Sequence, residues 1–210
     1  AKAQVNEGSA STRTGLKADP HVSEIIEIER NLRLLAYTGG KMHLSGISTA
    51  TGVELIRSAK KEGLDITADV HLMNLCFTEA EMLGFDTRFK VLPVLRTQAD
   101  QEALWAGVLD GTLDAIVSDH RPGDPEEKEL EFDLANFGAP QLETVFAALC
   151  TQQPNTMQHF LNALNIGPRK VLDLAVNSIE VGATAELTLF DPSLPYNPNM
   201  HLEQWRFSPF

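Results

Sequence analysis

An adjacent aspartate and histidine, Asp119 and His120, form the sharpest chemical feature of the sequence. They close the apolar segment DAIVSD, which has the composition of a β-strand, and α/β proteins place catalytic and binding groups at the carboxyl ends of strands. A carboxylate at that position could ligate zinc, and it could also carry a proton to or from a metal-bound hydroxide. The structural alternative, an aspartate that caps the next turn beside a packed histidine, stays open.

The other histidines have less informative surroundings. His43, in the segment KMHLS, is a second candidate ligand, although a single histidine in a short strand is more often a hydrogen-bonded core residue. His21, His71 and His159 lack the HxH or HExxH spacing that places two imidazoles on one metal, so we expect structural or surface roles for them.

Several other sites are excluded by their missing motifs. The acidic run DPEEKELEFD lacks the alternating ligands and central glycine of an EF-hand, so we expect a solvated loop there. The sequence has no GxGxxG, P-loop or GxSxG motif and no plausible Cys–His nucleophile pair. Nucleotide binding and covalent hydrolysis therefore lack support.

The elements that would position Asp119 alternate along the chain. Helical spacing of apolar residues predicts helices over 20–40, 48–63 and 97–111, the last with Thr97 as its N-cap. Strands are predicted over 41–45, 65–70 and 114–119. Strands separated by helices of ten or more residues indicate βαβ units and a parallel sheet.

Shorter elements complete the predicted order. Thr78 and Glu81 have capping-box spacing, which predicts a short helix there, and a loop-like stretch opens the chain before residue 15. Further helices are predicted over 141–150, 156–164 and 169–174, and VGATAELTLFD is predicted to be a strand of a small β unit.

Composition limits the class of protein and its partners. The chain has 210 residues, of which 43% are hydrophobic and 22% charged, and this is typical of a globular domain. A formal charge of −12 argues against nucleic acid or anionic lipid as a partner. Two cysteines, no apolar run long enough to span a membrane and no secretion signal predict a soluble, cytoplasmic protein.

Five segments in series resemble the dihydroorotases of the amidohydrolase superfamily, from about Asn6 to the end of the chain. NEGSASTRTGLKADPHVSEIIEIERNLRLLAYTGG looks like the loop and helix after strand five of that barrel, and HLSGIST with VELIRSAKKEGLDITADV looks like strand six and its sequel. FDTRFKVLPVLR and DGTLDAIVSDHRP match the substrate-binding loop and the strand-eight acid. Allantoinases and other cyclic-amide hydrolases share much of this pattern.

The resemblance implies part of a TIM-like (β/α)8 metal-dependent hydrolase barrel. We expect residues 1–178 to form the C-terminal half of the barrel, from the strand-five loop to strand eight, and 179–210 to form part of a small flanking β-sandwich domain. A complete barrel takes about 250 residues, so a chain of this length is a part of one. The starting residue, Ala1, also suggests a piece of a longer protein.

The implied activity is the zinc-dependent interconversion of dihydroorotate and N-carbamoyl-aspartate in pyrimidine biosynthesis. In that reading Asp119 is both metal ligand and general acid/base, and Gly138, in ANFGAP, supplies backbone hydrogen bonds to the substrate. The strand-one HxH, the strand-four lysine or aspartate and the strand-five histidine of the family would lie upstream of Ala1. The resemblance thus implies zinc as cofactor and a small cyclic amide as substrate.

Departures from the family pattern fall at positions that do chemistry. Gly46 stands where the family has a metal-ligating histidine before IST, Leu92 replaces the substrate-binding asparagine of NPPLR, and Gly123 replaces the histidine of DHAPH. Around TADVHLMNL, the family's polar PHH is replaced by Leu72, Met73 and Asn74. Because glycine has no donor atom for zinc, the sequence leaves the activity open.

Three functions therefore stay in view. The chain could come from a working dihydroorotase, or from a non-catalytic dihydroorotase-like subunit that partners aspartate transcarbamoylase or forms a homo-oligomer. It could also belong to an allantoinase-like cyclic amidohydrolase. In each case we expect the rest of the barrel, from upstream sequence, to be a partner of this chain, because half a parallel barrel exposes apolar strand edges.

Overall fold

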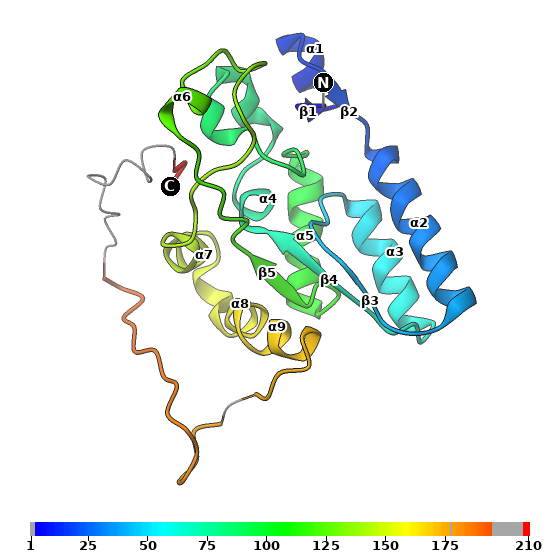
Figure 1. Cartoon of the computed structure of the whole chain (residues 1–210), viewed down its shortest axis with the longest axis vertical. Coiled ribbons are helices and arrows are strands. Elements are labelled where there is room, and N and C mark those ends of the chain that lie inside the picture. Colours follow the sequence, from blue (N-terminus) through cyan, green and yellow to red (C-terminus); the bar gives the residue numbers. More distant parts are fainter. Residues whose placement is uncertain (1–2, 177, 195–207) are drawn as a thin grey trace.

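A three-stranded parallel sheet lies at the centre of the computed structural model, which describes residues 3–176, 178–194 and 208–210. The strands β3 (Met42–Leu44), β4 (Ile66–His71) and β5 (Ala115–Val117) lie in the order β3-β4-β5 (Figure 1). The register pairs His43 with Thr67 and His71 with Val117, so the carboxyl ends of the three strands lie at one edge. The predicted parallel α/β arrangement is confirmed.

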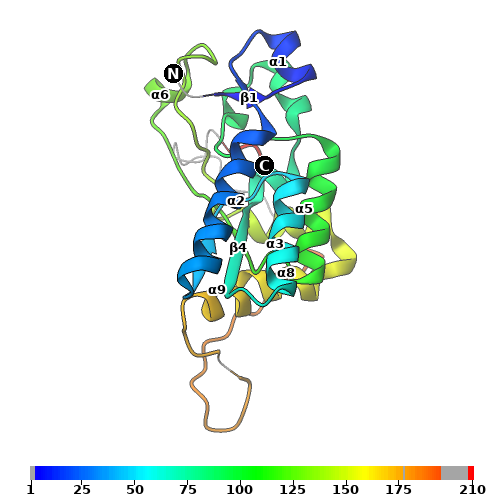
Figure 2. The same ribbon diagram turned by 90° about the vertical axis from the view of Figure 1, so that its right-hand side faces the viewer.

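Four helices pack in a row beside this sheet. They are α2 (His21–Thr38), α3 (Ala50–Lys61), α5 (Gln98–Asp110) and α8 (Met157–Leu164). Each contacts the next in that order, and α8 also contacts β5 (Figures 1 and 2). This single layer of helices connecting parallel strands is the arrangement expected of part of a TIM-like barrel.

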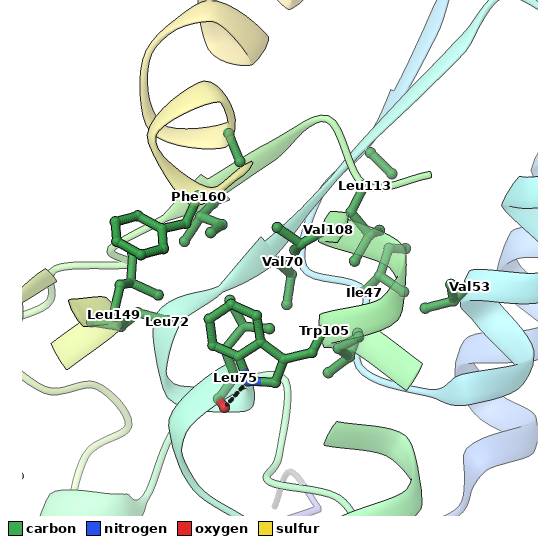
Figure 3. Close-up of a cluster of buried hydrophobic side chains, with 14 of the residues drawn as sticks. Ile47, Val53, Val70, Leu72, Leu75, Trp105, Val108, Leu113, Leu149 and Phe160 are labelled. Atoms are coloured by element: carbon green, nitrogen blue, oxygen red, sulfur yellow. Dashed lines mark hydrogen bonds between the residues drawn. The ribbon is translucent and has the colours of Figure 1, made fainter. Parts of the chain in front are cut away.

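The main core lies between the sheet and the helix layer. Alternate residues of β4, Ala68 and Val70, join Ile116 of β5 in this core, because successive side chains of a strand point to opposite faces. Trp105 of α5 packs among them, and its indole N–H donates to the Leu75 carbonyl at 2.9 Å (Figure 3). The buried indole therefore has a partner for its one polar atom.

The opposite face of the sheet is polar near the strand ends. Thr67, Asp69 and His71 of β4 alternate with the core residues of that strand, and His43 of β3 contacts two of them. In a closed barrel this face would point to the interior. One face of the sheet is therefore apolar and packs against the helices, and the other face carries ionisable groups.

The start of the described chain is more ordered than the sequence predicts. Instead of a loop, it forms β1 (Val5–Asn6), α1 (Ser9–Thr14) and β2 (Ala18–Asp19), with β1 and β2 parallel. Buried Arg96 holds them: its guanidinium donates to Asn6 Oδ1 at 3.0 Å and to Asp19 Oδ2 at 3.0 Å. The prediction was wrong because these partners are about 80–90 positions away along the chain.

Short helices connect the remaining parts. They are α4 (Leu72–Cys76), the 3-10 helices η1 (Glu79–Gly84), η2 (Thr87–Phe89) and η3 (Pro154–Thr156), α6 (Pro125–Lys128), α7 (Val145–Gln152) and α9 (Ile166–Val171). Thr78 does cap η1, but its hydroxyl accepts from the Ala80 N–H, so the predicted capping box with Glu81 is replaced by a tighter turn.

The predicted C-terminal strand is not formed in the described residues. Residues 178–194 contain no strand, and Ile179, Val181, Leu187 and Leu189 are exposed there. An alternating apolar segment needs a neighbouring strand to bury one face, and no described residue supplies that strand. Residues 195–207 lie outside the described part, so the small β-sandwich unit and the 178/179 boundary stay predictions. Within the described ranges, no helix is long and apolar enough to cross a membrane.

Candidate functional site

Asp69, near the end of β4, is the centre of the polar face. It is 4% exposed, and it accepts hydrogen bonds from His43 Nε2 at 2.9 Å, Ser45 Oγ at 3.1 Å and the Gly46 N–H at 2.8 Å. A buried carboxylate is tolerated when donors saturate it in this way. Asp69 therefore fixes the segment after β3 to the end of β4.

Gly46 lies directly above this carboxylate in a left-handed conformation, with φ +76°. A Cβ added there would lie 3.2 Å from His71 Nε2 and 3.3 Å from Pro93 Cδ. Both the backbone angle and the close neighbours thus favour glycine. The space that a side chain at position 46 would enter is taken by the His71 imidazole.

Asp119 lies just beyond β5, also in a left-handed conformation with φ +47°. Its Oδ1 accepts a hydrogen bond from Arg121 Nε at 2.8 Å, and its Oδ2 lies 3.4 Å from His71 Nδ1. The described residues give it no backbone N–H partner, so it does not cap the following turn. The carboxylate instead lies between a guanidinium and an imidazole.

His120 has the structural role that its position left open. Its Nδ1 accepts hydrogen bonds from the Gln141 N–H at 3.0 Å and the Leu142 N–H at 3.1 Å. His120 also forms a parallel bridge with Ala139. Because Nδ1 is the acceptor, it carries no proton, and this side chain ties the end of β5 to the loop at 139–142.

These strand ends line a cavity of about 550 Å³. Ser45, His71, Pro93, Asp119 and Arg121 are among its lining residues, which come from the ends of all three strands and from the segment around Pro93. We call this cavity the mouth. Its volume is in the range of small-molecule sites.

Gly138 packs against the mouth with φ +118°, and a Cβ added there would lie 2.6 Å from the Cβ of Arg121. Its N–H donates to the Lys90 carbonyl at 2.8 Å, and its own carbonyl accepts from Lys128 Nζ at 2.8 Å. The backbone of Gly138 is thus engaged inside the protein, and its proposed role toward a substrate stays a prediction.

Two buried lysines hold the loop that carries Gly138. Lys128 Nζ also donates to the carbonyls of Thr87, at 2.7 Å, and Asn136, at 3.0 Å, while Lys90 Nζ donates to the carbonyls of Phe132 and Asp133. Burial, with the nearby charge of Lys90, lowers the pKa of Lys128 to about 8 although Asp86 opposes this, and burial also lowers the pKa of Lys90.

The two other substituted positions have different surroundings. Leu92 is half-buried and precedes Pro93 in a cis peptide bond. A Cβ added to Gly123 would lie 3.4 Å from Glu127 Oε2, which is ordinary van der Waals contact. Position 123 could therefore hold a side chain, whereas position 46 could not without a shift of its neighbours.

The donors that this chain brings to the mouth are too few to hold a zinc ion without ligands from the half of the barrel that the chain does not span. Within the described part of the chain, no group of three or more histidine, cysteine, aspartate or glutamate residues is placed to hold a metal ion. Asp119 and His71 supply two donors, and a catalytic zinc takes at least three from protein. His43 is the second candidate ligand, and both of its ring nitrogens already form hydrogen bonds, one with Thr67 Oγ1 at 2.8 Å and one with Asp69.

Sequence reasoning missed Asp69, His71 and Arg121. His71 was expected to be structural or on the surface because it lacks a paired histidine, yet it is the last residue of β4. The rule that selected Asp119, position at a strand's carboxyl end, would have selected His71 as well. Asp69 lies two residues earlier on the same face, where the period of a strand places it.

The retained IST segment has a structural explanation. Glu24 of α2 accepts from the backbone N–H groups of Ser48 and Thr49 at 3.0 to 3.1 Å and also from their hydroxyls. The Thr49 hydroxyl in turn accepts from the Gly52 N–H, which caps α3. These hydrogen bonds join α2 to the start of α3, so the segment has a structural role in this chain.

The chain is similar to curated dihydroorotases over nearly its whole length. It is 40% identical to the dihydroorotase of Caldanaerobacter subterraneus subsp. tengcongensis over 196 residues, which are 91% of this chain and 45% of that protein. With the dihydroorotase of Thermus aquaticus it shares 38% identity over 217 residues, covering 98% of this chain and 51% of the relative. The chain therefore spans about half the length of these relatives.

Solved structures of the amidohydrolase superfamily have a similar fold. The L-hydantoinase (dihydropyrimidinase) of Arthrobacter aurescens matches with a TM-score of 0.65 and 27% identity, over 70% of this chain and 34% of its own. The inactive dihydroorotase-like domain of the Chaetomium thermophilum CAD-like multifunctional protein matches with a TM-score of 0.54 and 19% identity, over 71% of this chain and 42% of its own. No family model matches the chain.

The resemblance read from the five sequence segments is thus confirmed by relatives that align over the same range, and the parallel α/β fold agrees with them. This chain is a dihydroorotase homologue, and it corresponds to about half of the proteins that it matches.

Proposed function

We propose that this chain forms the C-terminal half of a dihydroorotase-type barrel in a protein of pyrimidine biosynthesis, and that its mouth does not hydrolyse the cyclic amide. The main support is the environment of Asp119, whose carboxylate forms a hydrogen bond with Arg121 and faces His71. A carboxylate that must take and return a proton during hydrolysis works best when it can approach the reacting water. Here a permanent positive charge occupies one of its oxygens.

The position of Gly46 supports the same proposal. Its φ of +76° and the nearby His71 ring disfavour any side chain there, so the strand-six ligand of the family has no equivalent at that point. Conversely, the hydrogen bonds of Glu24, Ser48, Thr49 and Arg96 keep the barrel segments in place. These contacts hold the scaffold together without any residue that lines the mouth.

A working dihydroorotase is the second candidate, because Asp119 is kept at the carboxyl end of β5 and lies in a cavity of suitable size. In that case zinc, held in part by upstream residues, would be the cofactor and Asp119 would be ligand and general acid/base. An allantoinase-like activity is the third candidate, and it would be recognised by its substrate.

For the non-catalytic reading we propose that the protein acts as a structural partner, of aspartate transcarbamoylase or of its own copies, in the cytoplasm. The support is the chain's similarity to dihydroorotases and the fold that it shares with the inactive dihydroorotase-like domain of a CAD-like multifunctional protein. Co-purification with aspartate transcarbamoylase, compared with a dihydroorotase of known activity, would test the partner.

Turnover by the full-length protein tests the proposal. Dihydroorotate, N-carbamoyl-aspartate and allantoin are offered in turn, with zinc added, and we expect no conversion above the rate of a blank. Conversion that disappears in Asp119→Asn but persists in the surface variant Asp110→Asn would contradict the proposal, and the substrate converted would name the activity. A folded but inactive wild-type protein supports it.

A further inference from the structure

The mouth contains a short chain of charged and polar groups that the proposed function does not by itself explain. Asp69 lies at one end of this chain of groups, and its Oδ1 is 4.0 Å from His71 Nε2. On the other side of the imidazole, His71 Nδ1 is 3.4 Å from Asp119 Oδ2. Arg121 ends the chain on Asp119 at 2.8 Å. Two acidic groups thus alternate with an imidazole and a guanidinium across the ends of β4 and β5.

We infer that His71 and Arg121 take the place of a metal ion at this mouth, so that the folded protein pairs Asp119 with its own side chains and carries no zinc there. This inference rests on the proposed function, because it concerns the same strand ends, but it makes a separate claim about their composition.

Space is the first argument. The His71 ring lies where the side chain of residue 46 would point, with Nε2 3.2 Å and Cε1 3.3 Å from the position of an added Cβ. His71 itself is nearly buried, with 12% of its side chain exposed. An imidazole from β4 therefore fills the volume from which the family's strand-six ligand would act.

Charge is the second argument. The 3.4 Å between His71 Nδ1 and Asp119 Oδ2 does not decide the question, because two ligands of one tetrahedral zinc also lie roughly 3.3 Å apart. Arg121 decides it. Its guanidinium, which stays charged in proteins, is already bonded to the other oxygen of Asp119, and a divalent cation beside it would meet direct repulsion.

The saturation of Asp69 is the third argument. Both of its oxygens accept hydrogen bonds, from His43 on one and from Ser45 and Gly46 on the other. Ligation of a metal would break these bonds, which also hold the segment after β3. The second carboxylate of the mouth is therefore a structural acceptor and is not available as a ligand.

Zinc content tests the inference on the full-length protein, purified without chelators and measured by elemental analysis. We expect far less than one zinc per chain. A content near one that falls in both His71→Ala and Asp119→Asn would overturn the inference, because it would make these two residues ligands.

A charge variant gives a second readout. In Arg121→Gln of the full-length protein the guanidinium is gone while His71 Nδ1 and Asp119 stay in place beside the zinc donors expected from the other half of the barrel, so we expect zinc to bind more tightly than to wild type in calorimetric titration with zinc chloride. Arg121→Lys, which keeps the charge, and Arg57→Gln, which removes a surface ion pair of α3, should bind no more than wild type. Equal lack of binding in Arg121→Gln and Arg121→Lys, both folded by circular dichroism, would show that the charge does not exclude the metal.

The two proposals fail separately. Zinc without turnover overturns the inference and leaves the non-catalytic function standing. Turnover without zinc does the reverse.

Discussion

At the residue scale, three glycines in and around the mouth differ in what the backbone permits. Gly46 and Gly138 both have positive φ, and both lie against other parts of the mouth, whereas Gly123 has room for a side chain. Sequence comparison treats Gly46 and Gly123 alike as lost histidines. The structure separates them, because an added Cβ would lie 3.2 to 3.3 Å from its neighbours at position 46 and at least 3.4 Å from them at position 123.

Gly138 offers a direct test of this close packing. Gly138→Ala places a Cβ 2.6 Å from the Arg121 Cβ and 2.9 Å from the Arg121 carbonyl, at a φ that L-residues disfavour. We expect the free energy of unfolding to fall by about 1 to 3 kcal/mol, measured by urea denaturation.

Gly84→Ala is the matched control for this change. Position 84 has no atom within 4 Å of an added Cβ and no positive φ, so this variant should unfold within about 0.5 kcal/mol of wild type. Equal free energies of unfolding for the two variants would show that the Gly138 loop does not pack closely against Arg121.

At the element scale, the loop between β5 and α7 depends on two lysines that make hydrogen bonds to carbonyls and, among the described residues, to no carboxylate. Three carbonyls, from Thr87, Asn136 and Gly138, surround the Lys128 ammonium, and Lys90 lies close enough to lower its pKa. Carbonyl dipoles compensate a buried charge only in part. The two lysines therefore join the segment that precedes Pro93 to the loop that carries Gly138, and their incomplete solvation lowers the stability of the folded protein.

This arrangement predicts a pH dependence with a definite sign. The pKa of Lys128 is about 8 in the folded protein and 10.5 when unperturbed, so between these values the unfolded chain binds more protons. The contribution of Lys128 to the free energy of unfolding must then increase with pH, by up to about 1 kcal/mol from pH 7.5 to pH 9. Urea denaturation at both values measures it.

Lys128→Met should remove this increase, whereas Lys61→Met, at an exposed position of α3, should keep it. Burial raises the pKa of the Cys76 thiol to about 12, which lowers stability at higher pH, but this effect is common to all three proteins and cancels in the comparison. An unchanged pH slope in Lys128→Met would mean that this lysine is not buried as a cation.

Local sequence patterns predicted the helices and strands whose apolar residues repeat at regular spacing. They failed where polar contacts between distant residues determine the structure. Apolar spacing, with Thr97 as an N-cap, predicted the helices α2, α3 and α5. The ends of the three strands of the central sheet were predicted to within a few residues. The ordered start of the chain depends on Arg96, about 80–90 residues away, and no local pattern shows such a partner.

The mouth was predictable only in part for a similar reason. Asp119 was found from its place after a strand, but its pairing with Arg121 and His71 requires β4 and β5 to be neighbours in a known register. Sequence shows that the family's ligand is missing at Gly46. It does not show that His71 fills that space.

At the scale of the whole molecule, one layer of helices covers one face of a three-stranded parallel sheet (Figures 1 and 2). The other face carries polar residues of the mouth. The chain also matches about half the length of its relatives. We therefore expect further strands beside β3 and β5, which would enclose the polar face and complete the mouth from the opposite side.

In the structure proposed for this mouth, His71 and Arg121 take the place of the metal. Crystals of the full-length protein grown with zinc chloride, with diffraction data collected at the zinc absorption edge, test it most directly. We expect no anomalous density between His71 and Asp119, and an Arg121 guanidinium bonded to Asp119 as described. A strong anomalous peak within about 2.2 Å of both side chains, with Arg121 displaced, would contradict it.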